Sequence, residues 1–158
     1  MRVFVLVVAL AACGNKKPEK VTSFVQSGVR FQVPQGWTAD LRSKDLVTLT
    51  PEKEVTNGPH IVIAPLITVQ PAEFKARNAE YCGKGFRSVD AVKPAGQLFE
   101  SGPFHGCVTD ITRSTGRQRR WELSDGRSVL SIGCNRDPDD AATAKLCEEL
   151  VATAKPEP

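Results

Sequence analysis

The sequence lacks the residue patterns on which most hydrolytic and metal-dependent chemistry depends. Its two histidines, His60 and His105, accompany no Gly-x-Ser-x-Gly elbow, Ser-x-x-Lys motif or recognisable triad. The five cysteines include no Cys-x-x-Cys pair, and no group of His, Cys and carboxylate residues shows metal-ligand spacing. A phosphate-binding loop ending in Gly-Lys-Ser or Gly-Lys-Thr is also absent. We therefore expect no catalytic residue, metal or cofactor, and we predict that the chain is not an enzyme.

A strong excess of one charge is missing as well. The chain has 21 Lys and Arg residues against 18 Asp and Glu residues, for a formal net charge of +3. A balance so close to neutral does not indicate a nucleic-acid partner, and we expect none. After Ala12, no apolar run is long enough to cross a membrane.

The most informative segment is the N-terminus. Arg2 leads into ten apolar residues, from Val3 to Ala12, and Cys13 follows them. A helix of that length would be about 15 Å long, half of the ~30 Å hydrocarbon core of a bilayer. The run therefore has the length of a secretory signal sequence and is too short for a membrane span.

Leu10-Ala-Ala-Cys13 resembles the lipobox of bacterial lipoproteins. In that family the cysteine sulfur receives a diacylglyceryl group and a peptidase cuts before the cysteine. The resemblance implies a signal peptide over residues 1–12 and a membrane anchor on Cys13. The alternatives are an ordinary cleaved signal peptide that ends in cysteine and a buried N-terminal strand. The absence of Asp after Cys13 favours the outer membrane over the inner membrane.

Hydrophobic patterning and turn signals predict a single α+β domain over residues 28–154. The predicted strands are 28–34, 46–50, 60–66, 96–100, 107–113, 117–123 and 127–134. Asp125-Gly126 is predicted as a two-residue turn that places Trp121 opposite Leu130. Residues 13–27 are predicted to be the lipidated cysteine with a flexible tether, and 155–158 a frayed tail.

Two helices complete the predicted domain. Pro71 suits a first helical position, and apolar residues at spacings of three and four extend this helix to Cys82. The second helix is predicted to begin at the capping residue Asp137, with Pro138 at its first position, and to run to Ala154.

Four cysteines remain after Cys13, and an exported chain with an even number usually pairs them. Free thiols and a zinc site are the alternatives. Cys82 lies on the first predicted helix and Cys107 on a strand, while Cys134 ends a strand and Cys147 lies on the second helix. This arrangement favours the pairs Cys82–Cys107 and Cys134–Cys147, each of which would join a helix to the sheet.

A cluster of arginines precedes Trp121. Its members are Arg113, Arg117, Arg119 and Arg120. One interpretation is a basic surface for anionic lipid headgroups, cell-wall polymer or an acidic partner. The other is a solvated hairpin in which arginines protect strand edges. Strand alternation places Arg119 and Arg120 on opposite faces, so the four do not form one patch. His60 and His105 are predicted to be ordinary surface or edge histidines.

Phe31-Gln-Val-Pro-Gln-Gly-Trp37 resembles the F-x-V-P-x-G-W opening of the PsbP-like superfamily, which includes bacterial DcrB-like lipoproteins. The order of the predicted elements agrees with that family. The resemblance implies an α+β sandwich, in which two main helices pack on an antiparallel sheet of about six to seven strands. Family members bind proteins or help to assemble complexes, and they share no catalytic residues.

The expected function is therefore that of a non-enzymatic, membrane-anchored lipoprotein domain that binds an envelope protein or assists an envelope complex. One alternative is a small envelope hydrolase, which requires His60 or His105 in a cleft beside a carboxylate or hydroxyl. Another is a carrier of a small apolar ligand, which requires a cavity between sheet and helices.

Overall fold

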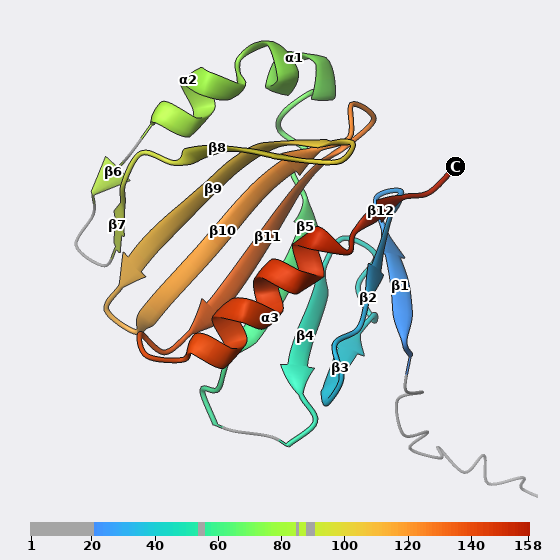
Figure 1. Ribbon diagram of the computed structural model, residues 1–158, viewed down its shortest axis with the longest axis vertical. Helices are drawn as coiled ribbons and strands as arrows, with labels where there is room; N and C mark the ends of the chain where they lie inside the picture. Colours follow the sequence, from blue (N-terminus) through green and yellow to red (C-terminus); the bar gives the residue numbers. More distant parts are fainter. Residues whose placement is uncertain (1–20, 54–55, 85, 88–90) are drawn as a thin grey trace, which may run out of the picture.

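The computed structural model describes residues 21–53, 56–84, 86–87 and 91–158 (Figure 1). The predicted signal peptide, residues 1–12, and the predicted lipidation site, Cys13, lie outside the described residues. Every strand pair is antiparallel, and helices pack against the strands, which confirms the α+β class. Among the described residues, no helix is long and apolar enough to cross a membrane.

Nine strands form the main sheet, in the order β3-β4-β5-β11-β10-β9-β7-β6, and β8 pairs with β9. They are β3 (Trp37–Asp40), β4 (Val47–Pro51), β5 (His60–Pro65), β6 (Phe86–Arg87), β7 (Ala91–Lys93), β8 (Gln97–Ser101), β9 (Phe104–Arg113), β10 (Gly116–Ser124) and β11 (Val129–Arg136). The sheet is larger than the expected six to seven strands because short segments such as β3 and β7 extend its edges.

A second sheet of three strands corrects two predictions. Its members are β1 (Ser23–Gln26), β2 (Val29–Gln32) and β12 (Lys155–Pro156). β1 lies in the segment predicted to be tether, 13–27, and β12 in the predicted tail, 155–158. A tight turn at Ser27 and Gly28, with φ of 49° and 76°, forms the β1–β2 hairpin. The ion pair between Arg30 and Glu157 holds the chain end beside β2.

The helices also differ from their predicted bounds. The first predicted helix is two short ones, α1 (Pro71–Ala76) and α2 (Asn78–Gly83). They are separated at Arg77, whose φ of −117° and ψ of 18° leave the helical range. The third, α3 (Ala141–Ala152), is capped by Asp140 and not by Asp137. The Asp140 carboxylate accepts a hydrogen bond from the Thr143 backbone N–H at 2.9 Å, which fixes the start of the helix there.

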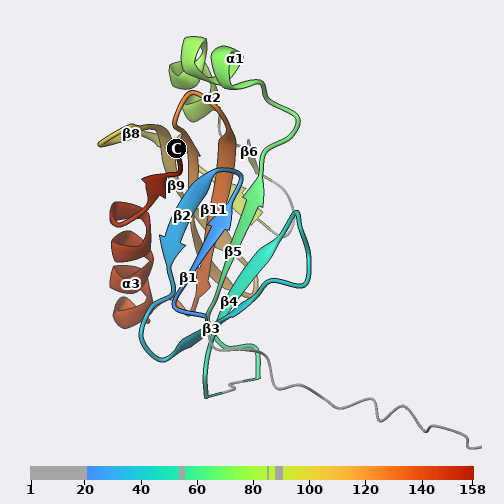
Figure 2. The same cartoon turned by 90° about the vertical axis from the view of Figure 1, so that its right-hand side faces the viewer.

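The hydrophobic core lies between α3, the small sheet and one face of the main sheet (Figures 1 and 2). Ile63 and Ile132 from neighbouring strands are fully buried, and Leu150 of α3 belongs to the same cluster. Phe24 and Phe31 from β1 and β2 stack with ring centroids 5.4 Å apart. Strand alternation therefore sends the remaining side chains of the main sheet to its other face.

The β10–β11 connection is longer than the predicted two-residue turn. Trp121 pairs with Ile132, and not with Leu130, so four residues, 125–128, link the strands. The Asp125 side chain accepts hydrogen bonds from the backbone N–H groups of residues 127 and 128, which stabilises the wider loop. The register shift is two residues, so each side chain stays on the face that the predicted turn would have given it.

Two disulfides join helices to the main sheet in the pairs that the sequence favours. Cys82 of α2 bonds Cys107 of β9, and Cys134 of β11 bonds Cys147 of α3, with Cα–Cα distances of 5.5 and 6.2 Å. All four cysteines are buried. Structural disulfides persist in oxidising compartments, so both pairs are compatible with an extracytoplasmic location.

The face of the main sheet away from α3 has a different character. Its residues on β4, β10 and β11 are half-buried and mostly small or polar; they include Thr48, Gln118, Glu122 and Ser131. We call this surface the polar face. α2 packs over its β9 side, where the Cys82–Cys107 bond is made.

Candidate functional site at one end of the sheet

The candidate site is a cleft at the end of the main sheet where β5 begins and β9 and β11 end. Its cavity volume is about 460 Å³. The turn before β5, the β9–β10 turn and the end of β11 line it. In Figure 1 the β9–β10 turn and the end of β11 lie beside each other at the lower left.

A row of polar side chains crosses four adjacent strands at this end. Gln118 of β10 lies opposite Asn135 of β11, which lies opposite His60 of β5. The Gln118 Nε2 group donates to Asn135 Oδ1 at 3.0 Å, and Arg113 Nη2 donates to Gln118 Oε1 at 3.1 Å. We call Arg113, Gln118, Asn135 and His60 the polar row.

Two glycines give the cleft its shape. A Cβ atom on Gly133 would lie 2.9 Å from Gln118 Nε2, so the missing side chain leaves room for the polar row. Gly116 has a φ of 141°, and a Cβ there would lie 2.9 Å from the Arg136 carbonyl oxygen. Both positions therefore favour glycine for steric reasons.

His60 is placed to exchange protons with a bound molecule. Its Nδ1 atom lies 3.2 Å from the Gly58 carbonyl oxygen. When Nδ1 donates this hydrogen bond, Nε2 carries the lone pair and can accept a proton. The Thr115 hydroxyl and the Asp137 carboxylate belong to residues lining the same cleft. His60 thus lies in a cleft, which is one part of the condition that the hydrolase alternative sets, and its ring hydrogen-bonds to a backbone carbonyl oxygen.

His105 lies elsewhere and is only half exposed. Its ring centroid is 6.1 Å from that of the buried Phe74 on α1, and its Nε2 atom is buried without a hydrogen-bond partner among the described residues. His105 is therefore a packing residue between α1 and β9.

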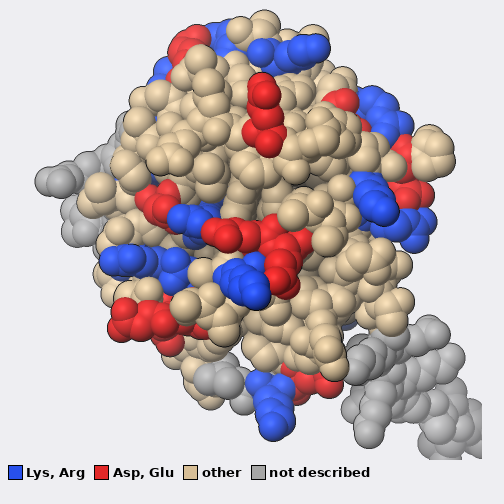
Figure 3. Space-filling model, viewed as in Figure 1, with Lys and Arg blue, Asp and Glu red and all other residues tan. Residues whose placement is uncertain are grey.

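The predicted basic cluster divides among the cleft, the α3 side of the sheet and the polar face. Arg113 and Arg117 line the cleft. Arg119 binds Asp110 at 2.8 Å and also pairs with Glu148 of α3. Arg120 lies on the polar face and pairs with Glu122 at 3.0 Å. Figure 3 shows the face that carries α3, where basic and acidic side chains are interspersed.

Arg136 is a cleft residue that the sequence analysis does not single out. It lies directly opposite Arg117 in the β10–β11 register, and like charges in that position repel each other. Its Nη1 group donates to the carbonyl oxygens of Asp137 and Pro138, while its buried Nε has no partner in the described structure. Only the strand register shows that two arginines meet here.

Among the described residues, the arginines that line the cleft form no ion pair. Within the described ranges, no carboxylate lies within 4.0 Å of the guanidinium groups of Arg113, Arg117 or Arg136. The pKa of nearby Asp110 is lowered mainly by its hydrogen bond to Arg119 and further by the charges of Arg136 and Arg117. The described lining of the cleft thus carries three arginines against one carboxylate, a balance that suits an anionic ligand.

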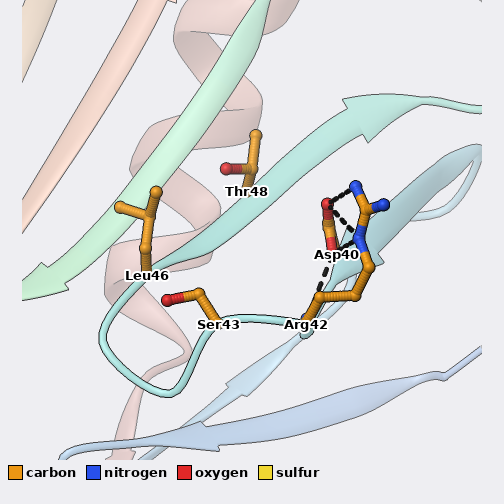
Figure 4. A pocket seen from close by; sticks show the side chains of 5 residues that line it. All are labelled: Asp40, Arg42, Ser43, Leu46 and Thr48. Atoms are coloured by element: carbon orange, nitrogen blue, oxygen red, sulfur yellow. Dashed lines mark hydrogen bonds and ion pairs between the residues drawn. The ribbon is translucent and has the colours of Figure 1, made fainter.

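A second pocket of about 280 Å³ lies at the β3–β4 loop (Figure 4). Asp40 and Arg42 on its wall bind each other, with Nε 2.8 Å from Oδ1. The hydrogen bond from Arg42 lowers the pKa of Asp40 to about 2. Because the two charges neutralise each other, this pocket offers less to a charged ligand than the cleft does. In the described part of the chain, no three His, Cys, Asp or Glu residues are grouped to hold a metal.

No protein-family model matches the sequence. The chain is 28% identical, over 150 residues, to a tRNA uridine(34) hydroxylase from Albidiferax ferrireducens, covering 82% of this chain and 46% of that protein. The chain thus spans about half the length of that relative. Because the relative is named for an enzymatic activity, the prediction that this chain is not an enzyme is contradicted.

Among solved structures, the chain is similar to cyanobacterial PsbP (CyanoP) from Synechocystis sp. PCC 6803. The TM-score is 0.49 at 11% sequence identity, with 91% of this chain and 98% of that chain covered. The α+β class stated above rests on the strand pairing and the helix packing themselves.

Proposed function

We propose that this chain is a membrane-anchored lipoprotein of the bacterial cell envelope whose domain binds its ligand or partner in the cleft. The lipobox-like residues 10–13 support a lipid on Cys13. The two disulfides support folding outside the cytoplasm. The observation that carries the proposal is the polar row: Arg113, Asn135 and His60 line the cleft from three strands, and Gln118 of the fourth strand hydrogen-bonds to two of them.

The polar row is suited to binding because its side chains are already held in place. Gln118 is bonded on both sides, by Arg113 and to Asn135, so little side-chain freedom remains to be lost when a ligand enters. Arg113 uses one of its five N–H donors in this network and is exposed. Gln118 therefore restrains Asn135 and one N–H group of Arg113, and the other N–H groups of Arg113 are available to a ligand.

Photo-crosslinking in living cells tests this proposal directly. A photoreactive side chain at Thr115, an exposed residue of the cleft, is expected to give a discrete adduct. The matched control is position 127, in the β10–β11 loop at the other end of the sheet, which should not give that adduct. Equal adducts from both positions, or none from the cleft, would contradict the proposal.

Acid–base catalysis by His60 is a second candidate function, favoured by its place in the cleft and by the enzyme name of the relative. His60 Nε2 would take the proton of a water that attacks the carbonyl carbon or phosphorus of a bound ester, and would return it to the alcohol oxygen as the ester bond breaks. With a panel of carboxylic and phosphate esters that includes tRNA, His60→Asn should lower any measured rate at least about 100-fold. An active His60→Asn variant would exclude this role.

The carrier alternative gains no support from the two cavities described above. Their walls come from strand ends and from the β3–β4 loop, and not from the layer between the main sheet and α3. In that layer, Ile132 and Cys147 are fully buried, and Leu150 is 2% exposed.

A further inference from the structure

We infer that the cleft end of the domain faces the membrane and that the cleft binds the phosphate of an anionic lipid headgroup. The inference deepens the proposed function and rests on it, because it requires the lipid anchor on Cys13. It concerns the same cleft, and it adds the chemical class of the ligand and the orientation of the domain.

The orientation follows from where the described chain enters the fold. β1 begins at Ser23, and in Figures 1 and 2 this entry point lies at the same lower end as the turn that precedes β5. That turn, with Asn57 and Gly58, is one wall of the cleft. The residues between Cys13 and Ser23 span at most about 35 Å when fully extended. A lipid on Cys13 therefore lets this lower end of the domain face the bilayer, although β1 enters on the right and the β9–β10 turn lies on the left in Figure 1.

The charge of the cleft matches a phosphate. Arg117 and Arg136 oppose each other across β10 and β11, and Arg113, at the end of the adjacent strand, lines the cleft from the polar face. A phosphate beside them would relieve the repulsion, and guanidinium groups match its oxygens with paired hydrogen bonds. The opposite end of the sheet differs, because Arg127 there pairs with Asp125 at 3.1 Å.

The acidic groups near the cleft do not cancel this charge. Asp110 is held by Arg119. Although burial by itself raises the pKa of Asp140, hydrogen bonds from Thr143 lower it, and the carboxylate is committed to capping α3. Asp137 is the carboxylate-bearing residue in the cleft wall, against three arginines and His60.

The test uses the processed chain, residues 13–158, with Cys13→Ser so that vesicle binding does not report the lipid. This chain contains every described element. Binding is measured to phosphatidylcholine vesicles with and without phosphatidylglycerol, and to inorganic phosphate and soluble glycerophosphoglycerol. We expect binding only to vesicles that contain phosphatidylglycerol, with competition from the soluble headgroup.

Variants locate the binding surface. Each arginine near an anionic surface is worth about fivefold in affinity, so Arg113→Gln with Arg117→Gln should weaken vesicle binding about 25-fold. Arg127→Gln removes an equivalent charge at the other end of the sheet and should leave binding unchanged. Circular dichroism and thermal unfolding establish that the variants fold. Competition between inorganic phosphate and the vesicles for the unaltered domain tests the cleft without any substitution at these arginines.

The outcomes separate this inference from the proposed function. Binding of phosphate and glycerophosphoglycerol without vesicle binding would overturn the membrane orientation and leave the cleft as a ligand site. Equal loss in the Arg127→Gln control, or tighter binding of tRNA than of the vesicles, would overturn the lipid assignment. No binding to any anion would overturn the inference, whereas the proposed function would then be judged by the crosslinking result.

Discussion

At the scale of single residues, Gly133 controls whether the polar row can form. Gln118 passes this glycine to reach Asn135, and a Cβ at position 133 would lie 2.9 Å from Gln118 Nε2, so the Gln118 side chain would have to shift. The chemistry of the cleft thus depends on a residue that has no side chain.

Gly133→Ala should therefore destabilise the protein through Gln118. The new Cβ would displace Gln118 Nε2 and break its hydrogen bond to Asn135, which is worth about 1 kcal/mol. When Gln118 is already Ala, the same substitution should be neutral or stabilising, because Ala has less freedom to lose than Gly. Urea unfolding of the two single variants and the double variant measures this difference. Equal effects in both backgrounds would show that the clash is not with Gln118.

The lowered pKa of Asp140 implies that the contribution of the α3 cap to stability depends on pH. Its folded-state pKa lies below the ordinary value of 3.8, so its contribution is fully present above that value and is lost as the pH falls through the folded pKa. Asp140→Ala should cost about 1 kcal/mol of unfolding free energy at pH 7 and less in strong acid. Asp139→Ala, one residue earlier and outside the cap, is the control. An identical cost at both pH values would mean that the charge of the cap is irrelevant.

At the scale of elements, alternation made most of the main sheet predictable. The predicted faces of β10 and β11 are correct even though their register is not, because a shift of two residues preserves the face of every side chain. β12 escaped prediction because a short segment with a proline forms a strand only when β2 is beside it.

The candidate site could be predicted only in part, because strand pairing brings some of its residues together. His60, Arg113 and Arg117 stand out locally, by residue type and by clustering. Gln118 and Asn135 are ordinary polar residues until strand pairing places them between Arg113 and His60. No local pattern encodes that pairing.

The disulfide Cys134–Cys147, which joins α3 to the sheet, is expected to raise the free energy of unfolding. It closes a loop with a sequence separation of 13, which corresponds to about 3 kcal/mol in the chain-entropy model. Cys134→Ala with Cys147→Ala should therefore lower the free energy of unfolding by at least that amount under oxidising conditions. In the presence of reductant the gap to the unaltered protein should shrink sharply, since both then lack the bond. A gap that reductant leaves unchanged would mean that the two substitutions act through packing alone.

At the scale of the whole molecule, the two described chain ends meet on the small sheet. β1 and β12 flank β2, and the Arg30–Glu157 ion pair ties the C-terminal strand to it. The fold therefore gathers both ends on the small sheet and leaves the cleft between the turns at one end of the main sheet. Such an arrangement allows an anchor at one chain end without blocking the cleft.

The proposed lipid anchor and the cleft arginines predict different results in cell fractionation. Each methylene buried in the bilayer adds about 0.8 kcal/mol to the free energy of membrane binding, and each arginine near an anionic surface adds about 1 kcal/mol. Two or three acyl chains on Cys13 therefore contribute far more to membrane binding than the arginines of the cleft do. After cell fractionation, Cys13→Ser should appear in the soluble fraction or remain uncleaved and longer by its signal peptide. Arg113→Gln with Arg117→Gln should stay in the membrane fraction, because its lipid is intact. If Cys13→Ser were processed and still membrane-bound, the lipid would not be the anchor, and the arginine-lined end of the sheet would have to provide the attachment.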